Sequence, residues 1–120
     1  METILIIEDY RDLRDVLRDL LELEGYRVIT AGSGREALST LSSERPTLIV
    51  MNLGLPDMSG LVLYETIQMT ETLRRIPMIV MTGFTNIDIN GVKMLYKPVQ
   101  WSQLRNAIAD VLEPAVQKLG

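Results

Sequence analysis

Short apolar runs alternate along the chain with longer segments in which apolar residues recur every three or four positions. The runs predict five buried strands, at residues 4–7, 27–31, 47–51, 78–81 and 93–96. The segments between them predict four amphipathic helices. The first covers residues 13–21 and stops before Gly25, the second begins after Ser33, the third covers about 60–72 and the last runs from Trp101 to Leu112. In the third helix we expect Leu61, Tyr64 and Ile67 to face inward. We assign the apolar stripes of all these helices to the core. Such alternation is typical of an α/β protein with a parallel sheet.

The alternation fails between the fourth and fifth strands. Only fourteen residues separate Thr82 from Lys97, too few for two loops, a full helix and a strand. The segment contains an Asn90-Gly91 turn signal, so we expect a loop with at most one helical turn. Right-handed crossovers then predict a doubly wound, five-stranded parallel sheet with helices on both faces and the fourth helix shortened or absent.

The composition narrows the possible chemistry. The 120 residues are 47% apolar and 23% charged, and we expect residues 1–120 to form a single domain. Cys and His do not occur, which excludes disulfides, imidazole bases and Cys/His zinc sites. A net charge of −4 argues against direct binding to nucleic acid. No apolar run resembles a signal peptide or a membrane span, so we expect a cytoplasmic protein without membrane association.

Polar residues follow four of the five predicted strands. Glu8 and Asp9 follow the first strand, Asn52 the third, Thr82 the fourth and Lys97 the fifth. Each has a simpler interpretation alone: Asp9 as a helix cap, Glu8 and Lys97 as solvated residues, Thr82 as an ordinary strand residue. Ligands bind outside the carboxyl ends of such strands, so the joint placement favours one shared site. Two adjacent carboxylates there favour neutralisation by Mg²⁺ and a Lys.

In this combination the residues resemble a response-regulator receiver domain, the phosphoryl-accepting module of two-component signalling. The resemblance covers the whole chain and rests on five motifs in order, ILIIEDY, GYRVITAGSGREAL, LPDMSG, IPMIVMTG and YKP. It implies the flavodoxin-like strand order 2-1-3-4-5. It also implies an acceptor Asp at position 52, supported by Thr82 and Lys97, where this sequence has Asn52.

The amide of Asn52 changes the expected chemistry. An amide oxygen is a poor nucleophile, so we expect no phosphoryl acceptance, no catalytic residue and no enzymatic activity. The oxygen of this amide can still face a cation. We therefore expect a weakened or absent Mg²⁺ site, whose ligands would be Asp9, Asn52 and the Gly54 carbonyl, with Glu8 acting through water. Asn52 is either native to a pseudo-receiver that signals by binding or a substitution in a competent receiver, and the sequence leaves both open.

The resemblance also implies a switch in which an aromatic residue moves together with Thr82, and the aromatic residue is missing at the usual position here. Receivers often carry an aromatic residue three positions before the Lys, where this chain has Met94. Tyr96 shares the strand face of Met94, because side chains alternate along a strand. Tyr96 either substitutes for the aromatic switch or covers the edge of the sheet.

The resemblance implies docking to a histidine kinase, a phosphotransfer domain or a downstream effector. One alternative is a flavodoxin-like protein that binds a small ligand or nucleotide on the same sheet. The acidic pair Glu8 and Asp9 argues against it, and the glycine-rich turn lacks the Lys-Ser/Thr ending of a phosphate loop, so we expect Ser33 to be a helix cap. A Mg²⁺-dependent phosphatase is a third possibility, but its nucleophile would be Asp57, too far round the turn.

Overall fold

A computed structural model describes residues 2–113 of the chain. Within these residues the elements are β1 (Thr3–Ile7), α1 (Arg11–Leu23), β2 (Arg27–Ala31), α2 (Gly34–Leu41), β3 (Leu48–Asn52), α3 (Gly60–Gln68), β4 (Met78–Thr82), β5 (Lys93–Tyr96) and α4 (Trp101–Leu112). All strand pairs are parallel, in the order β2-β1-β3-β4-β5. The predicted fold class and strand order are confirmed, and in the described chain no helix lies between β4 and β5.

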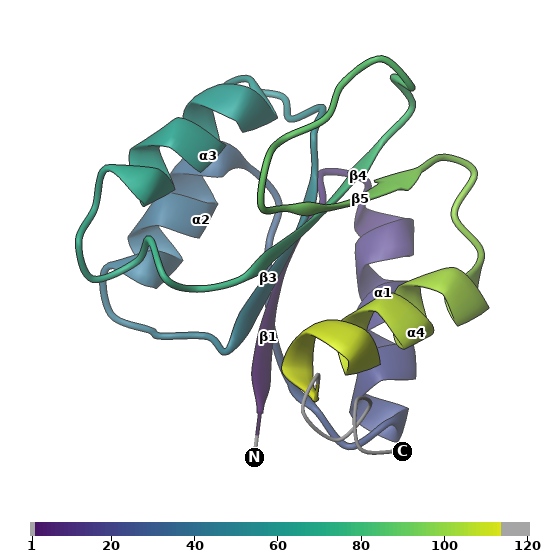
Figure 1. The fold of residues 1–120 in the computed structure, drawn as a ribbon. Coiled ribbons are helices and arrows are strands. Elements are labelled where there is room, and N and C mark those ends of the chain that lie inside the picture. Colours follow the sequence, from purple (N-terminus) through teal and green to yellow (C-terminus); the bar gives the residue numbers. More distant parts are fainter. Residues whose placement is uncertain (1, 114–120) are drawn as a thin grey trace.

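Helices cover both faces of the sheet, α2 and α3 on one and α1 and α4 on the other (Figure 1). Side chains alternate along β1 between two cores, because successive residues of a strand point to opposite faces. The α2–α3 core includes Leu5, Ile7, Ile49, Met51, Leu63 and Ile67. The α1–α4 core includes Ile4, Ile6, Leu48, Val50, Leu104 and Ile108. Each fully buried Leu or Ile contributes about 1.5–3 kcal/mol, so these cores hold the strand ends in fixed positions.

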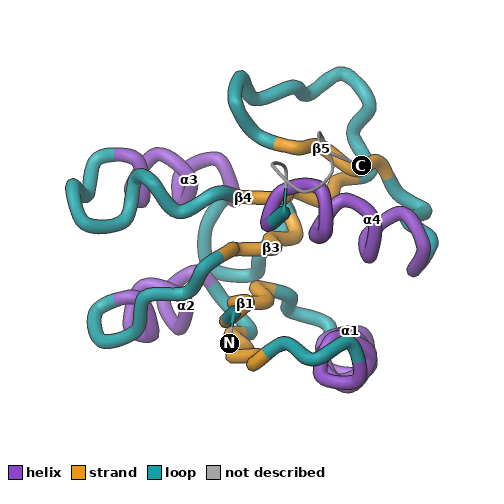
Figure 2. Tube along the Cα trace, turned by 60° about the horizontal axis from the view of Figure 1, so that its bottom comes forward, coloured by secondary structure: helices purple, strands orange, loops and turns teal. Residues whose placement is uncertain are grey.

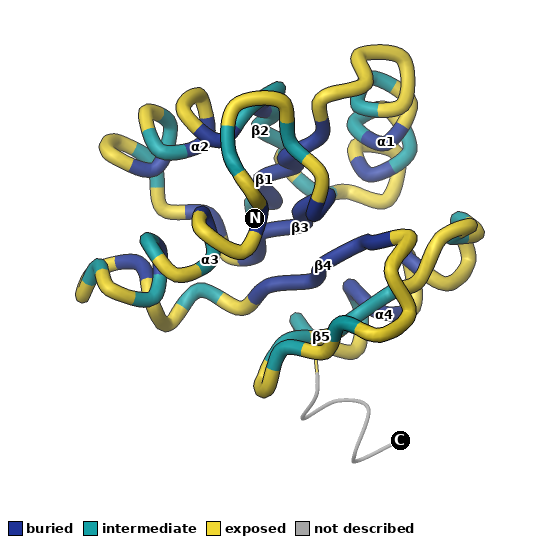
Figure 3. The backbone as a smooth tube through the Cα atoms, turned by 90° about the horizontal axis from the view of Figure 1, so that it is seen from above, coloured by how far each residue is buried: buried dark blue, intermediate teal, exposed yellow. Residues whose placement is uncertain are grey.

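The central strands are buried on both faces, whereas β5 is at the edge and partly exposed (Figure 3). Among residues 2–113, none of the helices combines the length and apolarity that crossing a lipid bilayer requires.

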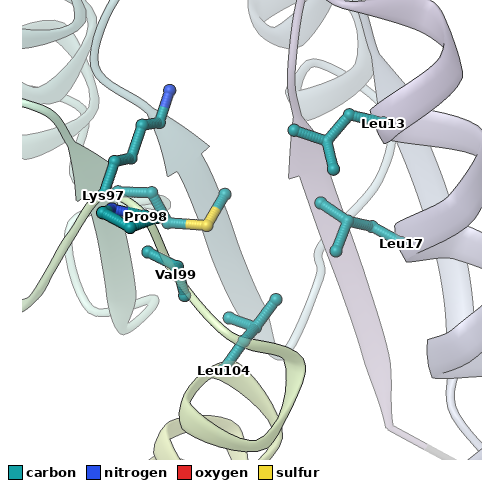
Figure 4. A pocket seen from close by; sticks show the side chains of 7 residues that line it. Leu13, Leu17, Lys97, Pro98, Val99 and Leu104 are labelled. Atoms are coloured by element: carbon teal, nitrogen blue, oxygen red, sulfur yellow. The ribbon is translucent and has the colours of Figure 1, made fainter.

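The apolar stripe of α1 is only partly buried, which corrects the prediction that all helical stripes belong to the core. Leu17 and Leu21 are buried, but Leu13 is 38% exposed and Val16 is 52% exposed. Leu13 borders a groove of about 210 Å³ between this part of α1 and the chain after β5, and Val16 lies outside the lining of this groove. Leu13 and Leu17 line the groove on one side (Figure 4). Part of the stripe therefore forms an apolar surface.

A similar correction applies to α3. Leu63 and Ile67 are its buried apolar side chains, whereas Leu61, predicted to face inward, is 37% exposed and Tyr64 is half-buried. The helix ends at Gln68, and turns continue to Ile76. The buried pair is spaced by four residues, so Leu61, two positions before Leu63, lies on another side of the helix.

The segment between β4 and β5 is a packed loop, as predicted, and it arches beside β5 (Figure 2). Ile87, Ile89 and Val92 pack against the α2–α3 core. The Tyr96 hydroxyl donates a hydrogen bond to the Ile87 carbonyl at 2.9 Å. The loop thus adds apolar side chains to the α2–α3 core without forming a helix.

We expect the amides of residues 85–91 to exchange rapidly with solvent. Within the described chain, the backbone amides that donate here are those of Phe84, to the Thr82 hydroxyl, and Val92, to the Ile89 carbonyl. Amides without hydrogen bonds open with free energies near zero. Hydrogen exchange measured by NMR tests this, with the amides of β3 as the slow internal control. Strong protection throughout residues 85–91 would reveal a helix that the structure lacks.

Candidate functional site

The sheet register brings the predicted polar residues to one edge. Ile7 pairs with Met51 and Asn52 pairs with Met81, so Glu8 and Asn52 lie at the ends of neighbouring strands. The Lys97 amide donates to the Thr82 carbonyl at 2.8 Å, which extends the pairing of β4 and β5 by one residue. Residues from both ends of the sequence therefore meet where the strands end.

Glu8 is almost fully buried, with an exposed fraction of 1%. Its Oε2 accepts a hydrogen bond from the Tyr10 amide at 3.0 Å, and within residues 2–113 its Oε1 has no hydrogen-bond partner. Burial raises the pKa of Glu8, and the Tyr10 amide and Lys97 oppose this effect. Its contribution to stability is therefore present in acid and lost as pH rises through the raised pKa. The interpretation of Glu8 as a solvated residue is wrong.

Asp9 does not cap α1, so the simpler interpretation of this residue is also wrong. The N-cap residue is Tyr10, which makes no side-chain capping bond. Asp9 is exposed, and its Oδ1 accepts a hydrogen bond from the Asn52 side chain at 3.3 Å. Asp9 therefore belongs to the cluster at the strand ends.

Asn52 connects the cluster. Its side-chain nitrogen Nδ2 lies 3.0 Å from the Gly54 carbonyl, 3.3 Å from Asp9 Oδ1 and 3.4 Å from Glu8 Oε2. On the other side of the amide, Lys97 Nζ donates to Asn52 Oδ1 at 2.7 Å. Asn52 is only 7% exposed, whereas Asp9, Gly54 and Lys97 are exposed, so these contacts are partly shielded from water. The structure thus brings Glu8, Asp9, Asn52, Gly54 and Lys97 into one hydrogen-bonded cluster.

Thr82 lies at the same edge but outside this hydrogen-bonded cluster. It is 2% exposed, and its hydroxyl accepts a hydrogen bond from the Phe84 amide at 3.0 Å. Met94 packs against the α2–α3 core, and Tyr96 bonds the loop at Ile87. Tyr96 therefore connects β5 to the loop before it through a hydrogen bond. A switch role for Thr82, Met94 and Tyr96 stays a prediction.

The loop after Asn52 is held close to β3. The Gly60 amide donates to the Leu53 carbonyl at 2.9 Å, and a Cβ atom on Gly60 would lie 2.5 Å from that oxygen. Only glycine fits this close approach. Gly54 also forms a short bridge with Ser59, which fixes the position of the Gly54 carbonyl in the cluster.

Asp57 has a role that its place in the sequence does not reveal. Its two carboxylate oxygens accept hydrogen bonds from the amides of Gly34 at 2.8 Å and Arg35 at 2.9 Å, at the start of α2. Ser33 is the N-cap, as predicted, and accepts from the Glu36 amide at 3.1 Å. The unpaired amides at the start of a helix attract anions, so the start of α2 was the feature of the sequence from which a carboxylate partner could have been predicted. A carboxylate of this chain therefore already accepts from the amides that follow the glycine-rich turn, and both oxygens of Asp57 are engaged there.

Asp57→Asn is expected to lower the melting temperature at neutral pH. The amides of Arg35 and Gly34 lower the pKa of Asp57. A lowered pKa gives stability that is present above the unfolded pKa, about 3.9, and lost as pH falls through the folded pKa. The difference between wild type and variant should therefore disappear in acid. Melting curves across pH measure it, with Asp88→Asn as the control, and a difference independent of pH would contradict the assignment.

Mg²⁺ is the cation that the resemblance implies for this cluster. Carboxylates and a carbonyl are suitable ligands for this ion. However, all three groups face the nitrogen of Asn52, whereas the sequence led us to expect its oxygen there. In the described residues, no group of three or more His, Cys, Asp and Glu side chains is arranged to hold a metal. The arrangement in this structure does not fit Mg²⁺.

The sequence of this chain matches a known protein family over most of its length. A family model described as "Response regulator receiver domain" matches residues 4–109. The polar-differentiation response regulator DivK of Brucella ovis is 39% identical over 83 residues, which cover 69% of this chain and 68% of DivK.

Solved structures show the same fold. The chemotaxis response regulator CheY4 of Vibrio cholerae aligns with a TM-score of 0.86 and 25% identity over 93% of this chain and 99% of CheY4. The response regulator TrrA of Thermotoga maritima, solved in complex with Mg²⁺-BeF, aligns with a TM-score of 0.82 and 24% identity over 93% of this chain and all of that one. Because the family model spans most of the sequence and the fold agrees, this chain belongs to the response regulator receiver domain family.

Proposed function

We propose that this receiver domain signals by docking to a partner protein and does not accept a phosphoryl group. The observation that carries the proposal is the Asn52 side chain, which lies at the end of β3 and accepts a hydrogen bond from Lys97 at 2.7 Å. An amide at this position offers no carboxylate oxygen to attack phosphorus. Thr82 and Lys97 then support no transfer, and Mg²⁺ binds weakly or not at all.

The exposed apolar surface beside the cluster supports the docking role. Leu13 and Leu17 of α1 face Pro98, Val99 and Leu104 across the groove, and Lys97 lies at its edge (Figure 4). Val16, 52% exposed, extends the apolar area along α1. Exposed apolar side chains grouped in this way mark interaction sites.

Receiver domains interact with histidine kinases, phosphotransfer proteins or effectors, and we assign a partner of this kind to the groove. The partner would bury Leu13 and Val16 and would contact Lys97 at the edge of the groove. In this proposal the domain acts in the cytoplasm, has no substrate of its own, and conveys a signal by occupying its partner.

A competition experiment tests the proposal. The cognate kinase phosphorylates the Asn52→Asp variant in the presence of increasing amounts of wild-type protein. If wild type docks without accepting phosphate, it should inhibit this transfer and carry no label. Leu13→Asp should abolish the inhibition, whereas Leu23→Asp, at a residue 82% exposed on the same helix, should not. Label on wild type, or no inhibition by it, would contradict the proposal.

A further inference from the structure

The side-chain nitrogen of Asn52 lies where three oxygen atoms converge. The Gly54 carbonyl, at 3.0 Å, is within the usual hydrogen-bond range, and the carboxylate oxygens of Asp9 and Glu8, at 3.3 and 3.4 Å, are slightly longer. An amide nitrogen has two hydrogens and shares them among the three acceptors. These acceptors are the groups that a hard cation would otherwise require. The nitrogen therefore supplies to them the positive partner that they would find in a metal ion.

Lys97 fixes the orientation of this amide. Its ammonium group donates to Asn52 Oδ1 at 2.7 Å, a short hydrogen bond from a charged donor. Turning the amide by half a revolution would place nitrogen against nitrogen at Lys97. It would also place oxygen among the three acceptors. The opposite orientation thus loses all four contacts unless a cation enters at the same time.

From these contacts we infer that Asn52 is a built-in substitute for the cation and closes the acidic cluster to Mg²⁺. To bind, the ion must displace the nitrogen from Gly54, Asp9 and Glu8. If Asn52 is then to provide its oxygen as a ligand, the Lys97 bond must also break. A cation that used Asn52 Oδ1 as a ligand and the Lys97–Asn52 bond therefore exclude each other. The inference rests on the proposed function and deepens it, because the cluster is complete without metal or phosphate.

A variant that removes the side-chain amide of Asn52 distinguishes the two possible roles of this residue. Asn52→Ala loses the amide oxygen but also vacates the position of the nitrogen, and it leaves Glu8, Asp9 and the Gly54 carbonyl unchanged. We expect the affinity of Asn52→Ala for Mg²⁺ to be higher than that of wild type by a factor of about ten or more. If the Asn52 oxygen were instead a metal ligand, the same variant would bind more weakly.

Isothermal titration calorimetry with MgCl₂ measures both affinities. Asn106→Ala, at an exposed position of α4, is the matched control and should bind like wild type. Affinity of Asn52→Ala equal to or below that of wild type would overturn the inference.

A second measurement uses only wild-type protein, so it stands even if Asn52→Ala does not fold. The Asn52 side-chain NH₂ signals in a ¹⁵N-¹H spectrum should be unchanged when Mg²⁺ is added. A shift of these signals with saturation would overturn the inference. Neither titration reports on docking, so such a result would leave the proposed function to its own competition experiment.

Discussion

Replacing Asn52 with Asp is expected to lower the free energy of unfolding by about 1–3 kcal/mol when no divalent cation is present. The substitution puts a carboxylate oxygen where Nδ2 now lies, within 3.0–3.4 Å of the Gly54 carbonyl and the carboxylates of Asp9 and Glu8. Three favourable contacts thereby become repulsive. Lys97, 2.7 Å from Oδ1, offsets part of this cost because it gains a negative partner.

Urea unfolding with and without Mg²⁺ measures this effect. Adding Mg²⁺ should restore most of the stability of Asn52→Asp, because the ion neutralises the three carboxylates. Asn106→Asp, which makes the same change of charge on the exposed side of α4, should change stability little. An Asn52→Asp protein that is more stable than wild type without Mg²⁺ would show that the carboxylates do not repel one another.

The strand ends were predictable from the sequence because simple patterns determine them. Apolar runs and helical periodicity identified the strands, and in a parallel sheet all carboxyl ends meet at one edge. Glu8, Asn52 and Lys97 therefore had to lie near one another once the strands were known. The short segment between β4 and β5 and its Asn-Gly turn signal predicted a shortened or absent helix, and in residues 2–113 no helix lies there.

The orientation of the Asn52 amide could not be predicted in this way. It depends on the position of the Lys97 ammonium group, which is at the end of a flexible side chain and belongs to a residue 45 positions later in the sequence. A residue pattern records which groups are present and not which atom faces which neighbour. The same limit applies to Asp57, which lies in the loop before α3, because its partners Gly34 and Arg35 belong to α2.

The exposed part of α1 shows a second limit. The spacing of Leu13, Val16 and Leu17 is that of a buried stripe, but periodicity cannot tell a face covered by the same chain from one left open for a partner. Here only Leu17 of the three is buried.

Phosphorylation is expected to show the largest difference between wild type and Asn52→Asp. In the variant, the carboxylate oxygen at position 52 attacks the phosphorus of acetyl phosphate, a new P–O bond forms, and acetate leaves with the electrons of the broken bond. Lys97 is already within hydrogen-bond distance of position 52 and can stabilise the developing charge. The wild-type amide offers no such nucleophile.

The central claim is that the amide of Asn52 prevents this receiver domain from accepting a phosphoryl group. Intact mass spectrometry after incubation with acetyl phosphate and Mg²⁺ tests this claim most directly. We expect a phosphoryl adduct that hydroxylamine removes on Asn52→Asp, and none on wild type or on Asn106→Asp. The same labile adduct on wild-type protein would contradict the account.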